Sequence, residues 1–192
     1  IADEVQSGFG RTGKLFASEY WKENGCAPDI IATAKSIAGG VPLSAVIASK
    51  EVMDAVPGGT IGGTYGGNAL ACAAGLEVLK LMDEGGLVKR SQEIGKKVMA
   101  AFNEMKEKYE VVGDVRGLGA MIGVEFVKDK KTKEPNPEFV GKFIQECAKN
   151  GLLVENAGIY GNVIRFLAPL VITDAQLDAG LEIYENAIKA CM

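Results

Sequence analysis

The chain has 192 residues, of which 47% are hydrophobic and 24% are charged, and its formal net charge is −4. This composition is typical of a globular protein, and the mixed charges argue against nucleic-acid and membrane-surface partners. Histidine is absent. That absence excludes a Ser-His-Asp or Cys-His mechanism and any histidine-ligated metal site.

The four cysteines are far apart and form no CxxC pair. This pattern favours a reduced, cytoplasmic protein without a zinc site. The apolar run 30–49 has the length of a membrane span, but it contains a lysine, two adjacent glycines and a proline, so we expect no transmembrane segment there. The chain opens on Ile1 within an apparent strand end, which predicts a piece of a longer protein.

The first residues predict the end of a buried strand over 1–6. Asp3 would lie at the carboxyl end of that strand, where α/β sheets place functional groups. The glycine-rich loop that follows contains G-x-x-x-x-G-K from Gly8 to Lys14. A Walker A phosphate loop needs Ser or Thr at the next position, and Leu15 stands there, so a nucleotide-binding loop is disfavoured.

The rest of the chain predicts alternating helices and strands. The expected helices cover 15–24, 51–55, 68–83, 87–109, 137–150 and 173–192. The expected strands cover 30–34, 44–49, 111–116, 120–127, 152–154 and 163–166, and a turn over 35–40 joins the first two. The loop 57–67 holds six glycines in eleven residues, so its backbone can approach a ligand closely. We expect a domain boundary near residue 95.

Lys35 is the one charged residue between Asp29 and Lys50. Its apolar neighbours predict a buried segment, and burial lowers the pKa of a lysine. A neutral amine in a dry pocket is a nucleophile that forms Schiff bases with carbonyl compounds. A lysine at a helix end whose ammonium group reaches the surface remains the structural alternative.

Arg165 is likewise the one charged residue between Glu155 and Asp174. A guanidinium group in such an apolar strand needs a planar anionic partner, and a carboxylate fits it in a bidentate manner. The partner could belong to a substrate or to the protein itself. Arg116 precedes a glycine hinge and is predicted to be structural, whereas the role of Arg11 stays open.

Four motifs in order carry a resemblance to a known family. They are DEVQSGFGRTG (3–13), PDIIATAKSIAGG (28–40), GGTYGGN (62–68) and VIRFLAPL (163–170). Together they resemble the class III (omega) aminotransferases, which are pyridoxal 5′-phosphate (PLP) enzymes of fold type I. The resemblance implies an α/β fold. Residues 1–95 would form the C-terminal part of a large PLP-binding domain with a mixed, mostly parallel sheet, and 96–192 a small α+β domain.

The resemblance also implies the residues that bind the cofactor. Asp3 matches the carboxylate that pairs with the pyridine nitrogen, Val5 the apolar residue on a face of the ring, and Gln6 the amide near the phenolic oxygen. Lys35 matches the catalytic lysine that forms the Schiff base. Thr64 matches the hydroxyl that reaches the cofactor phosphate of a neighbouring subunit.

Arg165 matches the arginine that takes a substrate carboxylate. The implied reaction is transamination of an omega-amino acid, such as 4-aminobutyrate, with 2-oxoglutarate as amino acceptor. The implied assembly is a homodimer, or a dimer of dimers, with shared active sites. Ornithine or acetylornithine aminotransfer and amino-acid epimerisation remain alternatives, because the same lysine serves them. A catalytically silent fragment is a further alternative for this stretch by itself.

Overall fold

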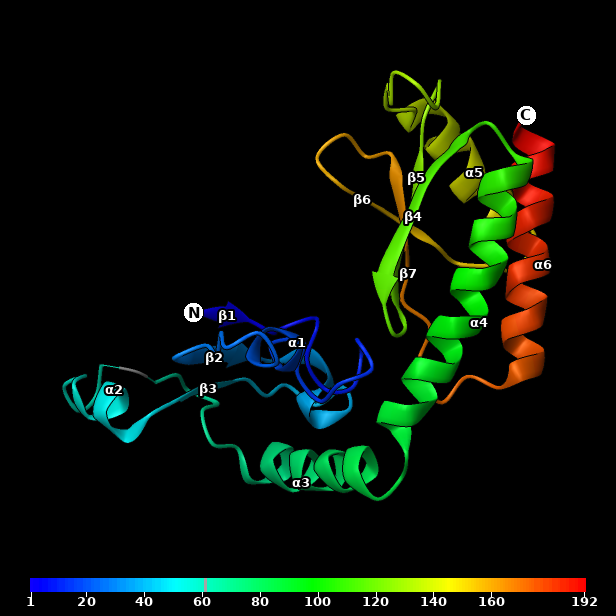
Figure 1. The fold of residues 1–192 in the computed structure, drawn as a ribbon. Helices are drawn as coiled ribbons and strands as arrows, with labels where there is room; N and C mark the ends of the chain where they lie inside the picture. The colour runs from blue at the N-terminus through cyan, green and yellow to red at the C-terminus, as the bar shows by residue number, and fades with distance from the viewer. Residues whose placement is uncertain (61) are drawn as a thin grey trace. The chain divides into compact units, whose positions relative to one another are not determined.

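A computed structural model describes residues 1–60 and 62–192 (Figure 1). Residue contacts divide the chain into two compact units, Ile1–Ser91 and Gln92–Met192. The expected glycine-rich loop over 57–67 includes position 61, which lies outside the described residues.

The first unit contains a three-stranded sheet. Its strands are β1 (Ala2–Asp3), β2 (Ile30–Thr33) and β3 (Ala45–Ala48), in the order β1-β2-β3. β1 runs parallel to β2, and β3 runs antiparallel to β2. Because β1 and β2 are parallel neighbours, their carboxyl ends meet at the same edge of the sheet.

Short and medium helices accompany this sheet within the described part of the unit. They are α1 (Glu19–Lys22), the 3₁₀-helix η1 (Lys35–Ala38), α2 (Lys50–Asp54) and α3 (Ala69–Asp83). The helix expected over 15–24 is therefore wrong in extent. Side-chain carboxylates bind the backbone N–H groups of Phe16, Ala17 and Ser18, and these bonds favour a turn over a regular helical ladder.

The second unit contains a four-stranded antiparallel sheet. Its strands are β4 (Val112–Leu118), β5 (Met121–Phe126), β6 (Glu155–Ala157) and β7 (Val163–Phe166), in the order β4-β5-β7-β6. The strand expected over 152–154 is wrong, because β6 begins at Glu155. The glycine-containing turn between β6 and β7 pairs Ala157 with Val163 and so sets the register, which leaves the apolar residues before Glu155 outside the ladder.

Three helices lie on one face of this second sheet (Figure 1). They are the part of α4 (Leu87–Lys108) that belongs to this unit, α5 (Pro137–Lys149) and α6 (Asp174–Cys191). The ring of Tyr184 packs 4.7 Å from Phe102 and 4.7 Å from Phe143, which joins the three helices in one core. No helix among residues 1–60 and 62–192 is long and apolar enough to cross a bilayer.

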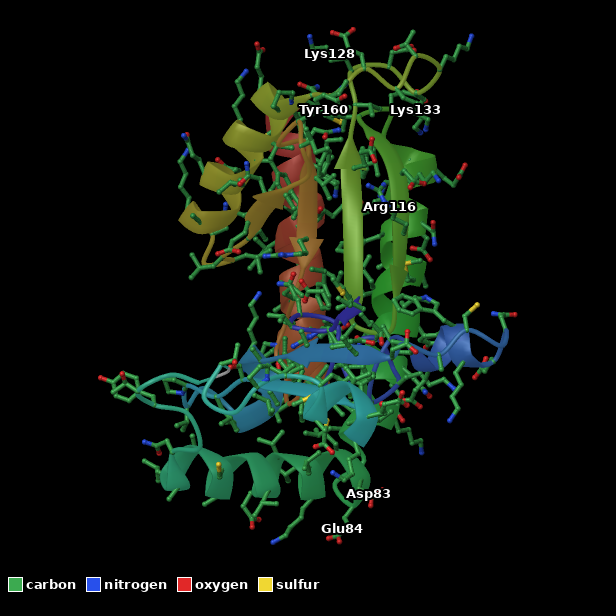
Figure 2. The ribbon with its side chains drawn as sticks, turned by 90° about the vertical axis from the view of Figure 1, so that its left-hand side faces the viewer. Asp83, Glu84, Arg116, Lys128, Lys133 and Tyr160 are labelled. Carbon is green, nitrogen blue, oxygen red and sulfur yellow. The ribbon has the colours of Figure 1, made fainter. Side chains whose placement is uncertain are left out.

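Residues on β5 alternate between this core and the opposite face. Ile122, Val124 and Phe126 are buried, whereas Gly123 and Glu125 lie on the other side and are half-buried. Figure 2 shows the strands in front of the helices, with Arg116 labelled on β4. The α/β prediction for the chain is confirmed by the two units together, the first with a mixed sheet and the second with an antiparallel one.

Helix α6 begins with a complete capping box. The Thr173 hydroxyl accepts a hydrogen bond from the Gln176 backbone N–H at 3.2 Å, and the Gln176 side chain accepts one from the Thr173 backbone at 3.1 Å. We expect Thr173→Ala to lower the free energy of unfolding by about 1 kcal/mol, because the helix loses its N-cap oxygen. Urea denaturation measures the loss, and Thr173→Ser, which keeps the oxygen, should stay within about 0.5 kcal/mol of the parent.

Candidate active site

The carboxylate of Asp3 and the amine of Lys35 come from the ends of neighbouring parallel strands. Asp3 ends β1 and pairs with Ala32 on β2, and Lys35 follows the end of β2 by two residues. The backbone N–H of Glu4 donates to the Ala32 carbonyl at 2.8 Å, which extends the pairing past Asp3. The first unit therefore presents an acid and an amine at one edge of its sheet, where open α/β sheets bind ligands.

Lys35 has an unusual backbone conformation. Its φ is +53°, in the left-handed region that side-chain-bearing residues seldom occupy. Such a conformation costs about 1–3 kcal/mol and often marks a functional position. Lys35 therefore stands at a strained turn between β2 and η1.

The burial predicted for Lys35 is wrong for this chain by itself, because the lysine is exposed. The apolar segment that led to the prediction is itself only partly covered. Val46 and Ile47 on β3 are 49% and 47% exposed. Because residues 1–60 and 62–91 leave these side chains about half exposed, the described part of the first unit does not enclose the amine of Lys35.

Helix α3 supports the turn that carries Lys35. Ala38 in η1 and Ala71 in α3 are 2% and 0% exposed. A Cβ atom on Gly75 of α3 would lie 3.3 Å from the Ile37 carbonyl oxygen, so the helix and the turn approach closely. Gly39 ends η1 in the left-handed region, with φ of +60°. This packing holds the backbone around Lys35 in one conformation.

Glu4 organises the loop that follows Asp3. Its side chain is 1% exposed and accepts hydrogen bonds from the Ser7 hydroxyl at 2.6 Å, the Ala17 N–H at 3.0 Å and the Ser18 N–H at 2.6 Å. Burial by itself would raise the pKa of this carboxyl, but the hydrogen bonds from Ser7, Ser18 and Ala17 outweigh it, so the pKa is lowered. We did not predict this role from the sequence, although a charged residue at the end of a buried strand is a signal for it.

Val5 and Gln6 lie two and three residues after Asp3 and are both half-buried. The Val5 N–H donates to Asp3 Oδ1 at 3.0 Å, which orients the carboxylate. Further along the same loop, Lys14 forms an ion pair with Glu23 at 2.9 Å, so the lysine of the Walker-like motif is engaged at the surface. The structure thus brings Asp3, Val5 and Gln6 together beside the end of β2.

Thr64 lies in a tight turn before α3. The Gly66 N–H donates to the Gly63 carbonyl at 2.9 Å, and Thr64 itself is exposed. The neighbouring Tyr65 is 79% exposed. The hydroxyl of Thr64 is therefore accessible from outside the first unit.

Arg165 belongs to the second unit, on β7, and is half-buried. Its Nη2 atom lies 3.3 Å from Glu155 Oε2 on the adjacent β6. Both residues also line a cavity of about 500 Å³ whose other walls are mainly apolar. The sequence allowed two kinds of partner for Arg165, a substrate carboxylate or a carboxylate of the protein. A carboxylate of the protein, that of Glu155, is present.

Arg116 forms ion pairs with Asp114 at 3.0 Å and with Glu125 at 2.6 Å. The prediction that Arg116 is structural is confirmed. Arg11 is half-buried, and burial lowers the pKa of its guanidinium group. Its carbonyl oxygen accepts a hydrogen bond from the Ser91 hydroxyl at 3.0 Å.

The parallel pair of β1 and β2 brings an acid and a lysine at a strained turn to one edge of the sheet, and a glycine-rich loop follows later in the chain. The chain belongs to the Aminotransferase class-III family, which matches residues 1–188. The family prediction is confirmed.

Two relatives share nearly half of the aligned residues with this chain. The chain is 47% identical over 190 residues to a probable 4-aminobutyrate aminotransferase of Bacillus subtilis, covering 99% of the chain and 43% of the relative. It is 49% identical over 186 residues to the 5-aminovalerate aminotransferase DavT of Pseudomonas putida, covering 97% of the chain and 43% of the relative. The chain therefore spans less than half the length of these relatives.

A solved structure shows the same fold. It is an amine transaminase from an uncultivated Pseudomonas species in a PLP-bound form, with a TM-score of 0.86 and 33% identity. The match covers 98% of this chain and 44% of that one. The prediction of the fold type I transferase architecture is confirmed by this likeness together with the family match.

Proposed function

We propose that the full-length protein transfers the amino group of a short omega-amino acid, 4-aminobutyrate or 5-aminovalerate, to 2-oxoglutarate. The observation that carries the proposal is the pairing of β1 with β2, which sets the Asp3 carboxylate and the Lys35 turn at one edge. Relatives named for these two donors, at 47% and 49% identity, support the choice of substrate.

The donor set at this edge fits PLP. An acid held by the Val5 N–H can pair with a protonated ring nitrogen, and an amine just after the end of the adjacent strand can bond to an aldehyde carbon. When bound, PLP supplies an electron sink for the electrons released at the substrate carbon.

Each residue has a distinct proposed role. The Asp3 carboxylate would hold the proton on the ring nitrogen. Val5 would pack on a ring face, and the Gln6 amide would lie near the phenolic oxygen. Lys35 Nζ would hold the cofactor through its aldehyde carbon and, once substrate has displaced it, would take the proton from the substrate carbon as general base and deliver it to the cofactor as general acid.

The substrate and subunit contacts involve two further residues. Arg165 would bind a substrate carboxylate by charge-assisted hydrogen bonds in at least one of the two half-reactions. Thr64, accessible at its exposed turn, contacts the cofactor phosphate of a second copy, so the proposed assembly is a homodimer or a dimer of dimers. We further propose a cytoplasmic protein. Its large PLP-binding domain would include 1–95, and 96–192 would form its small domain.

An amino-donor panel tests the proposal. The full-length protein, loaded with PLP, is given 2-oxoglutarate and one donor at a time: 4-aminobutyrate, 5-aminovalerate, ornithine or acetylornithine. We expect glutamate to form fastest with the first two donors. Preference for ornithine would overturn the choice of substrate, and a lack of glutamate with every donor would overturn transamination itself.

A further inference from the structure

Asp3 and Glu4 are adjacent in the sequence but lie on opposite faces of the extended chain. Ala2 and Glu4 are 3% and 1% exposed, whereas Asp3 is exposed, as the alternation of an extended strand requires. In the described part of the chain the Asp3 carboxylate accepts one hydrogen bond, from the Val5 N–H at 3.0 Å. The direction of this carboxylate therefore depends on where the Glu4–Val5 peptide group lies.

Every polar group of Glu4 is engaged within the first unit. Its N–H donates to the Ala32 carbonyl at 2.8 Å, and its carbonyl accepts from the Gly8 N–H at 3.0 Å. Its carboxylate accepts hydrogen bonds from the Ser7 hydroxyl and from two backbone N–H groups of the loop before α1. One residue thus ties together β2, the turn over 4–8 and the loop before α1.

The turn that follows Glu4 has little freedom to shift. A Cβ atom on Gly8 would lie 2.8 Å from the Glu4 carbonyl oxygen and 3.2 Å from the Phe16 ring, so the turn packs tightly against its neighbours. Hydrogen bonds to an ionised carboxylate are also stronger than those between neutral groups. The buried Glu4 side chain therefore fixes the peptide group that donates to Asp3.

We propose that Glu4 is a positioning residue that holds the Asp3 carboxylate in the direction that meets the ring nitrogen of PLP. The inference rests on the proposed role of Asp3. Glu4 is buried on the other face and acts through the Val5 N–H. Without this anchor the Asp3 carboxylate turns into solvent, and the ion pair that keeps the ring nitrogen protonated weakens.

The ¹⁵N resonance of ring-labelled PLP bound to the full-length protein tests the inference without turnover, because it reports whether the ring nitrogen is protonated. We expect a protonated ring nitrogen in the parent protein. Glu4→Gln keeps the shape of the side chain but replaces an acceptor oxygen by an NH₂ donor, so the resonance should move toward that of an unprotonated ring at neutral pH. The kcat should fall about tenfold with little change in KM, less than the hundredfold that a misplacement of about 1 Å can cause.

Three further variants separate positioning from a general structural role. Ser7→Ala removes one donor to Glu4, at 2.6 Å, and should move the resonance in the same direction by a smaller amount. Glu23→Gln is the matched control, because it removes an exposed pair of the same unit, with Lys14, and should leave the resonance and kcat unchanged. In an Asp3→Asn background, Glu4→Gln should cause no further shift, since a residue that acts through Asp3 has no effect without it.

Two results would overturn the inference by themselves. One is an unchanged resonance in Glu4→Gln, or in Ser7→Ala where Glu4→Gln does not fold. The other is a further shift from Glu4→Gln in the Asp3→Asn background, because Glu4 would then act by another route. A parent protein with an unprotonated ring nitrogen would reject the inference together with the proposed role of Asp3.

The same measurements keep the inference distinct from the proposed function. The expected shift in Glu4→Gln, in a protein that forms no glutamate from any donor, would retain the positioning role and reject transamination. Normal glutamate formation with an unshifted resonance in Glu4→Gln would retain the function and reject Glu4 as a positioning residue.

Discussion

Replacing Lys35 by Ala in the full-length enzyme should lower the rate of transamination by at least about a hundredfold. A positioned acid–base group contributes about 10²–10⁴ to a rate, and the Lys35 amine is proposed to move the proton at the substrate carbon. The variant should also lose the absorbance band of the lysine–cofactor bond. Borohydride should leave no reduced PLP adduct on the peptide that spans residue 35, as mass spectrometry would show.

Lys50→Ala is the matched control for this experiment. Lys50 lies in the same unit, is exposed like Lys35, and is paired with Asp54. Its removal should leave the rate, the absorbance band and the reduced adduct unchanged. Turnover retained by Lys35→Ala, or an adduct found on another lysine, would remove Lys35 from its proposed role.

The isolated 192-residue chain should behave differently from the full-length enzyme. Lys35 is exposed in it, and the apolar surface of β3 around this segment is uncovered. Binding sites for small molecules are concave and enclose most of the ligand's surface, and an exposed turn does not. We therefore expect little or no reducible PLP adduct when the chain alone is mixed with PLP, and a strong adduct would show that residues 1–192 suffice for cofactor binding.

The positions of Asp3 and Lys35 follow from local features of the sequence. An apolar strand ended by an acid, and a second apolar strand ended by a lone lysine, can pair side by side as parallel neighbours. The structure pairs Asp3 with Ala32, three residues before Lys35. Arg116 was also predictable as structural from its place before a glycine hinge, and its partners Asp114 and Glu125 lie on β4 and on the adjacent β5.

The exposure of Lys35 in this chain could not be predicted from its apolar neighbours alone. An apolar composition indicates that a segment packs against other residues, but it does not identify the part of the protein that supplies those residues. β6 was misplaced for a related reason. Leu152, Leu153 and Val154 have the composition of a strand, but the turn that joins β6 to β7 sets the register, and the pairing begins at Glu155.

The role of Glu4 was missed because its partners are distant in sequence. Ser7 is a near neighbour, but Ala17 and Ser18 lie 13 and 14 residues away, beyond the reach of motif or periodicity arguments. The same contacts explain why the helix expected over 15–24 is reduced to Glu19–Lys22. A buried carboxylate that captures backbone N–H groups competes with helix formation.

Glu4→Ala should lower the free energy of unfolding of the full-length protein by about 3 kcal/mol. The change leaves the N–H groups of Ala17 and Ser18 without their acceptor, and a buried unsatisfied donor costs about 1–3 kcal/mol. Urea denaturation, followed by circular dichroism, measures the loss. Glu23→Ala is the control, because Glu23 forms only an exposed pair with Lys14 and should cost no more than about 1 kcal/mol.

The pH dependence of the Glu4 effect identifies its charge as the cause. Hydrogen bonds lower the pKa of Glu4 in the folded protein, so its contribution to stability is present above the ordinary carboxyl pKa, about 4.3. The contribution is lost as pH falls through the lower, folded value. The stability gap between the parent and Glu4→Gln should therefore be constant at neutral pH and narrow below about pH 4. A gap independent of pH would mean that shape, and not the ionised carboxylate, holds the loop beside Asp3.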